Sequence, residues 1–178
     1  VVIFDGATGT HMQTLDLGPD DFGGAAYEGC NEILVRTRPA AVLDMHRAYF
    51  RAGADVTETN TFGGFSIPLS EYNIAHRCYE LNARAAELAR QAADEFTAMT
   101  PDRPRAVAGS IGPGTKFASL GQITYNELRD AYEEQSRGLL DGGVDLLLIE
   151  TQVVLLGLKA SRAGARRGSA RRWPRSCA

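Results

Sequence analysis

The chain has 178 residues, of which 44% are hydrophobic and 23% charged, and its formal net charge is −3 at pH 7. This composition is ordinary for a folded domain and excludes disordered, collagen-like and disulfide-scaffold proteins. No stretch approaches the roughly 18 apolar residues of a membrane span, and the N-terminus lacks the pattern of a signal peptide. We therefore expect a cytoplasmic protein.

Charge is distributed unevenly along the chain. The last twenty residues contain seven Lys or Arg and no acid, which leaves twelve basic and twenty-two acidic residues in the first 158. Such an acidic body is unsuited to the phosphates of nucleic acid. Residues 159–178 are predicted to form a disordered or irregular basic tail, and their abrupt change of composition also fits an out-of-frame gene end.

The first half of the chain predicts two strand-and-helix units. A strand is expected at Val1–Phe4, followed by a long loop and a helix that begins at Pro39, because proline is favoured in the first helical turn. A second strand is expected at Asp55–Glu58, followed by a long helix from Ser70 to about Phe96 that is rich in good helix formers.

The second half predicts two more units. A strand at Arg105–Ala108 leads into a glycine-rich loop, and the next helix begins near Thr124, which forms a capping-box pattern with Glu127. That helix is expected to end at Gly142. The fourth strand, Val144–Ile149, is apolar nearly throughout, as is typical of a parallel strand covered on both faces.

Alternating β and α units predict an α/β fold with a parallel sheet, either closed as a barrel or open and doubly wound. Periodicity does not distinguish these two forms. A closed (β/α)8 TIM barrel needs eight units, so the four found here would be its first half, with residues 1–158 as the partial barrel and residues 159–178 as the tail.

Each predicted strand ends in a polar or glycine-rich cluster. Asp5 follows the first strand, Thr59 and Asn60 follow the second, Ser110 follows the third, and Glu150 follows the fourth. The carboxyl ends of parallel strands share one edge, where ligands bind. Two carboxylates beside amide and hydroxyl groups suit a small ligand with an ammonium group, although each cluster alone is also typical of a turn or a cap.

Other candidate residues lack a supporting pattern. The loop GSIGPGT has neither the Walker ending nor the spacing of a dinucleotide site. The histidines share no spacing and are predicted to be exposed or internally hydrogen-bonded: His11, His46 and His76. The cysteines lack a C-x-x-C pair and are predicted to be free thiols outside any metal site: Cys30, Cys78 and Cys177.

Five ordered segments carry a resemblance to one family. They are FDGATGT (Phe4–Thr10), YEGCNEILVRTRP (Tyr27–Pro39), HRAYFRAGADVTETNTFGG (His46–Gly64), AGSIGPGTK (Ala108–Lys116) and ELRDAYEEQSRGLLDGGVDLLLIET (Glu127–Thr151). Together they resemble the N-terminal homocysteine-binding domain of the cobalamin-dependent methionine synthase family, which belongs to the homocysteine S-methyltransferases. The likeness is expected to fade after Thr151.

The resemblance implies a (β/α)8 barrel in which zinc binds homocysteine as a thiolate and cobalamin delivers a methyl group from methyltetrahydrofolate. It implies that Asp5 and Glu150 hold the amino group of homocysteine, with Thr59, Asn60 and Ser110 lining the pocket. The family's three zinc cysteines follow later strands than this chain contains. We therefore expect neither metal nor cofactor on this chain alone, assign no catalytic residue, and expect no turnover without the rest of the barrel.

Three alternatives stay open from sequence. One is a betaine- or S-methylmethionine-type homocysteine methyltransferase. A second is a non-catalytic half-barrel that associates through its open sheet edges with another copy of itself or with another chain. A third, a phosphate-binding barrel enzyme, is disfavoured because such sites usually follow strands seven and eight, which four units do not include.

Overall fold

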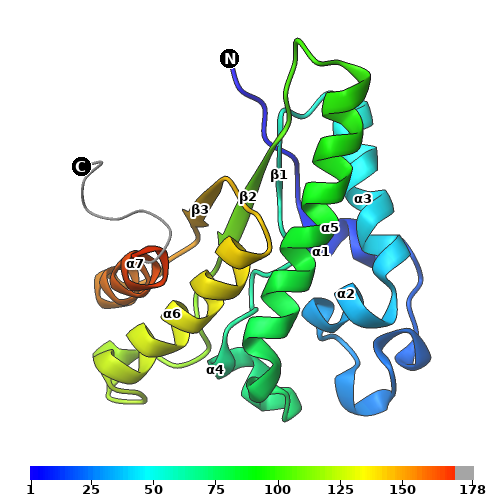
Figure 1. Ribbon diagram of the computed structural model, residues 1–178. Coiled ribbons are helices and arrows are strands. Elements are labelled where there is room, and N and C mark those ends of the chain that lie inside the picture. Colours follow the sequence, from blue (N-terminus) through cyan, green and yellow to red (C-terminus); the bar gives the residue numbers. More distant parts are fainter. Residues whose placement is uncertain (171–178) are drawn as a thin grey trace.

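The computed structural model of the protein describes residues 1–170 (Figure 1). The α-helices are α1 (Thr8–Gln13), α2 (Leu34–Thr37), α3 (Pro39–Ala52), α4 (Ser66–Leu69), α5 (Cys78–Met99), α6 (Tyr125–Asp141) and α7 (Leu155–Ser169). The strands are β1 (Val56–Glu58), β2 (Ala106–Ile111) and β3 (Leu146–Ile149). Short 3-10 helices span Pro19–Phe22, Ala25–Tyr27, Asn31–Ile33, Ser70–Tyr72, Ala75–Arg77 and Ala118–Leu120.

The three strands form a parallel sheet in the order β1-β2-β3. Thr57 lies opposite Val107, and Ser110 lies opposite Leu148. Consecutive parallel strands joined by right-handed crossovers place all their helices on one face of the sheet. Figure 1 accordingly shows α5 and α6 together in front of β1 and β2. The predicted strands at 55–58, 105–108 and 144–149 are thus confirmed in place.

The predicted strand Val1–Phe4 is present only as an isolated bridge. Phe4 pairs in parallel with Val56, and the backbone oxygen of Ile3 accepts hydrogen bonds from Asp55 and Val56. The segment therefore lies beside β1 as expected. A single bridge is too short to count as a strand, and the side chains of the segment are exposed. The pairing nevertheless brings Asp5 to the end of β1.

The α3 and α5 helices form as their sequences predict, with one difference at the start of α5. Pro39 occupies the first turn of α3, and the apolar face of the helix, including Val42, Met45 and Phe50, is buried. The second helix begins at Cys78 rather than at Ser70, because Asn73 has a φ of 58° in the left-handed region and breaks the helical path.

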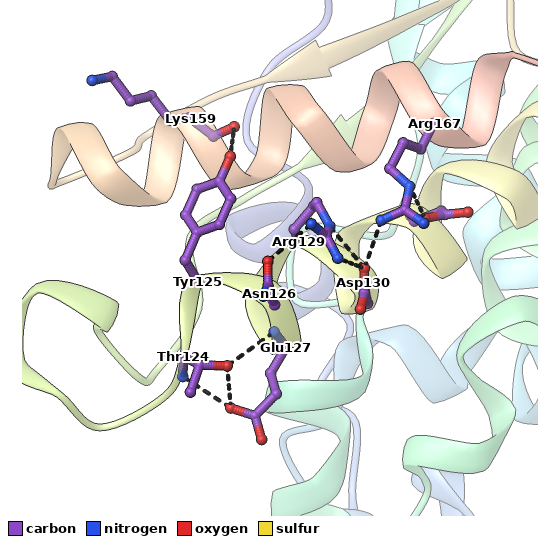
Figure 2. A network of polar contacts seen from close by, with 9 residues as sticks. Thr124, Tyr125, Asn126, Glu127, Arg129, Asp130, Lys159 and Arg167 are labelled. Carbon is purple, nitrogen blue, oxygen red and sulfur yellow. Dashed lines mark hydrogen bonds and ion pairs between the residues drawn. The ribbon is translucent and has the colours of Figure 1, made fainter.

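The predicted capping box at the start of α6 is confirmed (Figure 2). The backbone N–H of Glu127 donates to Thr124 Oγ1 at 3.2 Å, and the backbone N–H of Thr124 donates to Glu127 Oε2 at 2.9 Å. These bonds satisfy two backbone donors that a helix start otherwise leaves unpaired.

The expected irregular tail was wrong as far as Ser169, because residues 155–169 form α7. Small residues on one side of α7 let it pack closely on α6, and a Cβ at Gly164 would lie 2.6 Å from the backbone oxygen of Arg129. Figure 2 shows polar ties between the two helices: Arg167 pairs with Asp130 at 3.0 Å, and the Tyr125 hydroxyl donates to the Lys159 oxygen at 3.3 Å. The remainder of the predicted tail lies outside the described residues.

Strand β3 is less covered than its apolar sequence predicts. Within residues 1–170 it pairs only with β2, its other edge is free of strand partners, and Leu146 is 36% exposed. Val153 and Leu155, which follow it, are also exposed. The prediction of a strand buried on both faces was therefore wrong for this end of the sheet. None of the helices in residues 1–170 is both long and apolar enough to cross a bilayer.

Candidate functional site

A cavity of about 520 Å³ opens at the carboxyl end of the sheet. Its lining comes from the segment after Phe4, the 3-10 helix at Asn31–Ile33, the residues at and after the end of β1, and the ends of β2 and β3. All five residues that the sequence places in a ligand site line it: Asp5, Thr59, Asn60, Ser110 and Glu150. We refer to Asp5, Glu58 and Glu150 as the acidic cluster of this cavity.

Asp5 is held by the end of β1 through one of its two oxygens. Asp5 Oδ2 accepts hydrogen bonds from Thr57 Oγ1 at 2.6 Å and from the backbone N–H of Glu58 at 2.9 Å. Asp5 Oδ1 is buried and has no partner among residues 1–170. Burial raises the pKa of Asp5 to about 6 against these hydrogen bonds, with a further contribution from the charge of Glu150.

Glu58 and Glu150 complete the acidic cluster. Burial and, after it, the charges of Glu150 and Asp5 together raise the pKa of Glu58 to about 7. Glu150 is positioned by Ser110, whose hydroxyl donates to Glu150 Oε1 at 2.5 Å. Thr151, the next residue, has a φ of 54°, a conformation that is strained for a β-branched side chain. Carboxylates placed this close repel one another, and a bound cation would relieve that repulsion.

Thr59 and Thr61 hold β1 and β2 together at the base of the cavity. Thr61 Oγ1 donates its proton to the backbone oxygen of Ser110 at 2.8 Å. In the 2.6 Å contact between the two threonines, Thr59 Oγ1 is therefore the donor and Thr61 Oγ1 the acceptor. Thr59 Oγ1 in turn accepts the backbone N–H of Ser110 at 3.0 Å. The Thr59 hydroxyl is thus committed within the protein, and its part in the site is to keep Ser110 in place.

Asn60 and Glu32 connect the cavity to the first long loop. Asn60 Nδ2 donates to the backbone oxygen of Asn31 at 2.7 Å, and Glu32 Oε1 accepts the backbone N–H of Gly63 at 2.8 Å. Burial raises the pKa of Glu32. Sequence reasoning did not assign Glu32 to the site, because this residue follows no strand and only the folded loop brings it to the cavity.

Two further residues behind the acidic cluster were also missed. His46, on α3, is fully buried, and its Nδ1 lies 2.8 Å from Thr57 Oγ1. Burial lowers its pKa to about 3, so the imidazole is neutral at pH 7. The helical position of His46 and the strand position of Thr57 offered no sequence signal of their contact, since they belong to different elements. His76 is exposed, and His11 lies in α1.

The described residues do not fit a zinc site. No group of three or more His, Cys, Asp or Glu side chains in residues 1–170 is arranged to hold a metal ion. Cys30 and Cys78 are free thiols, as predicted, and the structure shows that both are buried. Burial raises the pKa of both thiols, that of Cys30 to about 12. Neither therefore offers a thiolate at neutral pH. Cys177 lies outside the described residues.

Sequence comparison identifies a family, and two methionine synthases are among the relatives that match. The profile of the family described as homocysteine S-methyltransferase matches residues 2–174, beyond Thr151, where the likeness was wrongly expected to fade. The chain is 51% identical over 167 residues to the methionine synthase of Mycobacterium leprae (strain TN) and 50% identical over 171 residues to that of Mycobacterium tuberculosis (strain ATCC 25618 / H37Rv). These alignments cover 94% and 96% of this chain but 14% of each relative.

Structure comparison finds the same fold in a solved homocysteine methyltransferase, MmuM from Escherichia coli. Its metallated form matches with a TM-score of 0.74 over 93% of this chain and 60% of that chain, and its oxidized form matches with a TM-score of 0.75 over 94% and 59%. Sequence identity is 22% in both cases, so this likeness bears on the fold alone.

Proposed function

Because the chain belongs to the homocysteine S-methyltransferase family, we propose that it is the part of a methionine synthase that binds homocysteine for S-methylation to methionine. In this proposal the four β/α segments are the first half of a (β/α)8 barrel, and the cavity is the substrate end of that barrel. The 50–51% identity to two methionine synthases favours this type over a betaine- or S-methylmethionine-dependent enzyme.

The observation that carries the proposal is the acidic cluster. Homocysteine has an ammonium group, whose N–H groups would donate hydrogen bonds to the unpartnered Asp5 Oδ1 and to the carboxylate of Glu150. Glu58 would add a third negative charge. Asn60, Ser110 and Thr59 keep the surrounding loops fixed, so that the amino-acid end of the substrate is oriented and its thiol is left facing outward from the sheet.

The described residues contribute binding and orientation rather than methyl transfer. We propose zinc and cobalamin as cofactors of the parent enzyme, where zinc would activate the thiol as a nucleophile. Residues 1–170 contain no suitable set of zinc ligands, so the metal would be held elsewhere in the longer protein. We expect this chain to bind homocysteine without turning it over. A cytoplasmic location stays a prediction.

Calorimetric titration of the chain with L-homocysteine tests the proposal. We expect one binding site whose affinity is the same with and without EDTA, because the acidic cluster needs no metal. Glycerol 3-phosphate, which lacks an ammonium group, serves as the negative control and is expected not to bind. Absence of homocysteine binding by folded protein at millimolar ligand, or equal binding of the phosphate, would overturn the proposal.

A second candidate function is association through β3. The outer edge of β3 has no strand partner in residues 1–170. Leu146 in β3 is exposed, as are Val153 and Leu155, which follow the strand in sequence. Such an edge pairs readily with another strand, from a second copy or from another chain. Sedimentation velocity over a hundredfold range of concentration tests this: growth in size would support self-association, and a constant monomer would exclude it.

A further inference from the structure

Asp5 is connected to a buried histidine through a single hydroxyl group. Thr57, which is fully buried on β1, contacts His46 Nδ1 at 2.8 Å on one side and Asp5 Oδ2 at 2.6 Å on the other. A threonine hydroxyl has one proton to donate. A carboxylate is an acceptor only, so the proton of Thr57 goes to Asp5, and the ring of His46 must donate to Thr57 through an Nδ1–H group.

This pattern determines the tautomer of His46. With its proton on Nδ1, the neutral ring carries a lone pair on Nε2, and Nε2 is buried without a hydrogen-bond partner among residues 1–170. An unpaired buried nitrogen costs free energy, and an apolar side chain of similar size would avoid that cost. The packing of α3 therefore does not account for a histidine at position 46, whereas the hydrogen bond to Thr57 does.

The arrangement also determines which oxygen of Asp5 is left without a hydrogen bond from the protein. Oδ2 receives both the Thr57 hydroxyl and the Glu58 N–H, whereas Oδ1 is buried beside the cavity with no partner among the described residues. Since His46 donates to Thr57, the hydroxyl cannot turn its proton away from Asp5. Hydrogen bonds in such a chain also polarise and strengthen one another.

We infer that His46 and Thr57 are a positioning pair, which holds the carboxylate of Asp5 so that its Oδ1 receives the ammonium group of the substrate. This inference rests on the proposed function, because it assumes that Asp5 binds an ammonium group. Neither His46 nor Thr57 touches the substrate. Their effect is therefore confined to ligands that carry the amino group.

The test compares two ligands across a small set of variants. L-Homocysteine and 4-mercaptobutyrate share a thiol and a carboxylate, but only the first has an amino group. Thr57→Val removes the hydroxyl at nearly constant shape, and we expect it to weaken homocysteine binding about tenfold, in line with the loss of a hydrogen bond to a charged group. His46→Leu is expected to weaken it about threefold, as for a neutral hydrogen bond.

Three controls separate positioning from packing. His46→Asn retains a donor where Nδ1 lies and should bind homocysteine like the wild type, as should His76→Leu, which changes an exposed histidine. In an Asp5→Asn background, both Thr57→Val and His46→Leu should lose their effect. Binding of 4-mercaptobutyrate should be the same in all these proteins. If His46→Leu does not fold, as judged by circular dichroism, the Thr57→Val and His46→Asn variants decide the question.

The possible failures are distinguishable. If wild-type protein binds homocysteine and Asp5→Asn weakens that binding, but Thr57→Val binds as tightly as the wild type, the positioning pair is overturned and the proposed function stands. If Thr57→Val weakens both ligands equally, the pair has a general structural role and the inference is also overturned. If the wild type binds no homocysteine, the proposed function itself fails.

Discussion

The two ends of the acidic cluster are built differently. Asp5 is held by two hydrogen bonds from the end of β1 and is supported from behind by the buried His46 and Thr57. Glu150 is held by the Ser110 hydroxyl, lies next to the strained Thr151, and belongs to the sheet edge where Leu146 and Val153 are exposed. One carboxylate is therefore fixed by the protein core, whereas the position of the other depends on how β3 and α7 are packed.

Replacing Asp5 should have the largest effect on ligand binding. Asp5→Asn keeps the shape and the acceptor for Thr57 but removes the charge that faces the ammonium group, so we expect homocysteine affinity to fall about a hundredfold, as is typical for truncating one member of a buried charge pair. Calorimetric titration measures this. Asp20→Asn, at an exposed position, is the matched control, and a loss of less than threefold for Asp5→Asn would show that Asp5 is not the anchor.

Disturbing α7 should show that the Glu150 end depends on helix packing. A Cβ at Gly164 would lie 2.6 Å from the Arg129 oxygen and 2.8 Å from the Cβ of Tyr132, so Gly164→Ala should push α7 from α6 and lower the free energy of unfolding by about 2 kcal/mol. Urea unfolding measures this change. Arg162→Ala, exposed on the same helix, should change stability by less than about 0.5 kcal/mol. Equal stability of the two variants would show that close packing of α7 on α6 does not stabilise the fold.

Replacing Glu150 should weaken binding less than replacing Asp5. Glu150→Gln keeps an acceptor for Ser110. It also removes the charge that, after burial, does most to raise the pKa of Glu58, so Glu58 ionises more readily and takes over part of the interaction. We expect a loss of about tenfold in homocysteine affinity. Glu28→Gln, at an exposed position, is the control. A loss as large as that of Asp5→Asn would mean that the two ends contribute equally.

The smallest effect concerns stability and pH at the Asp5 end. The pKa of Asp5 is raised in the folded protein, so the folded state holds this proton more tightly than the unfolded state, and ionisation of Asp5 destabilises the fold as pH rises from about 4 to about 6. Asp5→Asn should therefore match the wild type near pH 4 and be more stable by about 1 kcal/mol at pH 7.

Urea unfolding at pH 4 and pH 7 checks the sign of that difference. Comparing the variant with the wild type at each pH is essential, because His46 titrates in the opposite sense. Burial lowers its pKa, so its contribution makes the fold more stable as pH rises from about 3 to about 6.5. If Asp5→Asn is less stable than the wild type at pH 7, the ionised Asp5 carboxylate does not destabilise the fold, and this prediction is wrong.

The features that could be predicted from the sequence are those that depend on residues close together in the chain. The strands at 56–58, 106–111 and 146–149, the helix start at Pro39 and the capping box at Thr124 follow from periodicity and from residues a few positions apart. Asp5 and Glu150 reach one cavity because parallel strands end at one edge, and that topological argument is enough to bring them together.

What sequence does not predict depends on contacts between distant elements. The pairing of His46 with Thr57 joins a helix to a strand, and Glu32 reaches the cavity through an irregular loop. The α7 helix was missed because its basic and small residues show no apolar periodicity. Its packing depends on the small residues Gly164 and Gly168, which let the helix approach α6. The exposure of β3 depends on which strands lie beside it, and its apolar sequence carries no information about that.

Recognition of the ammonium group is tested by comparing the affinities of wild-type protein for L-homocysteine and 4-mercaptobutyrate at pH 8, where Asp5 and Glu58 are ionised. If the acidic cluster binds the ammonium group of the substrate, homocysteine should bind at least tenfold more tightly than the analogue that lacks this group. Equal affinities would contradict this role of the acidic cluster, because they would mean that the cavity recognises the thiol or the carboxylate without it.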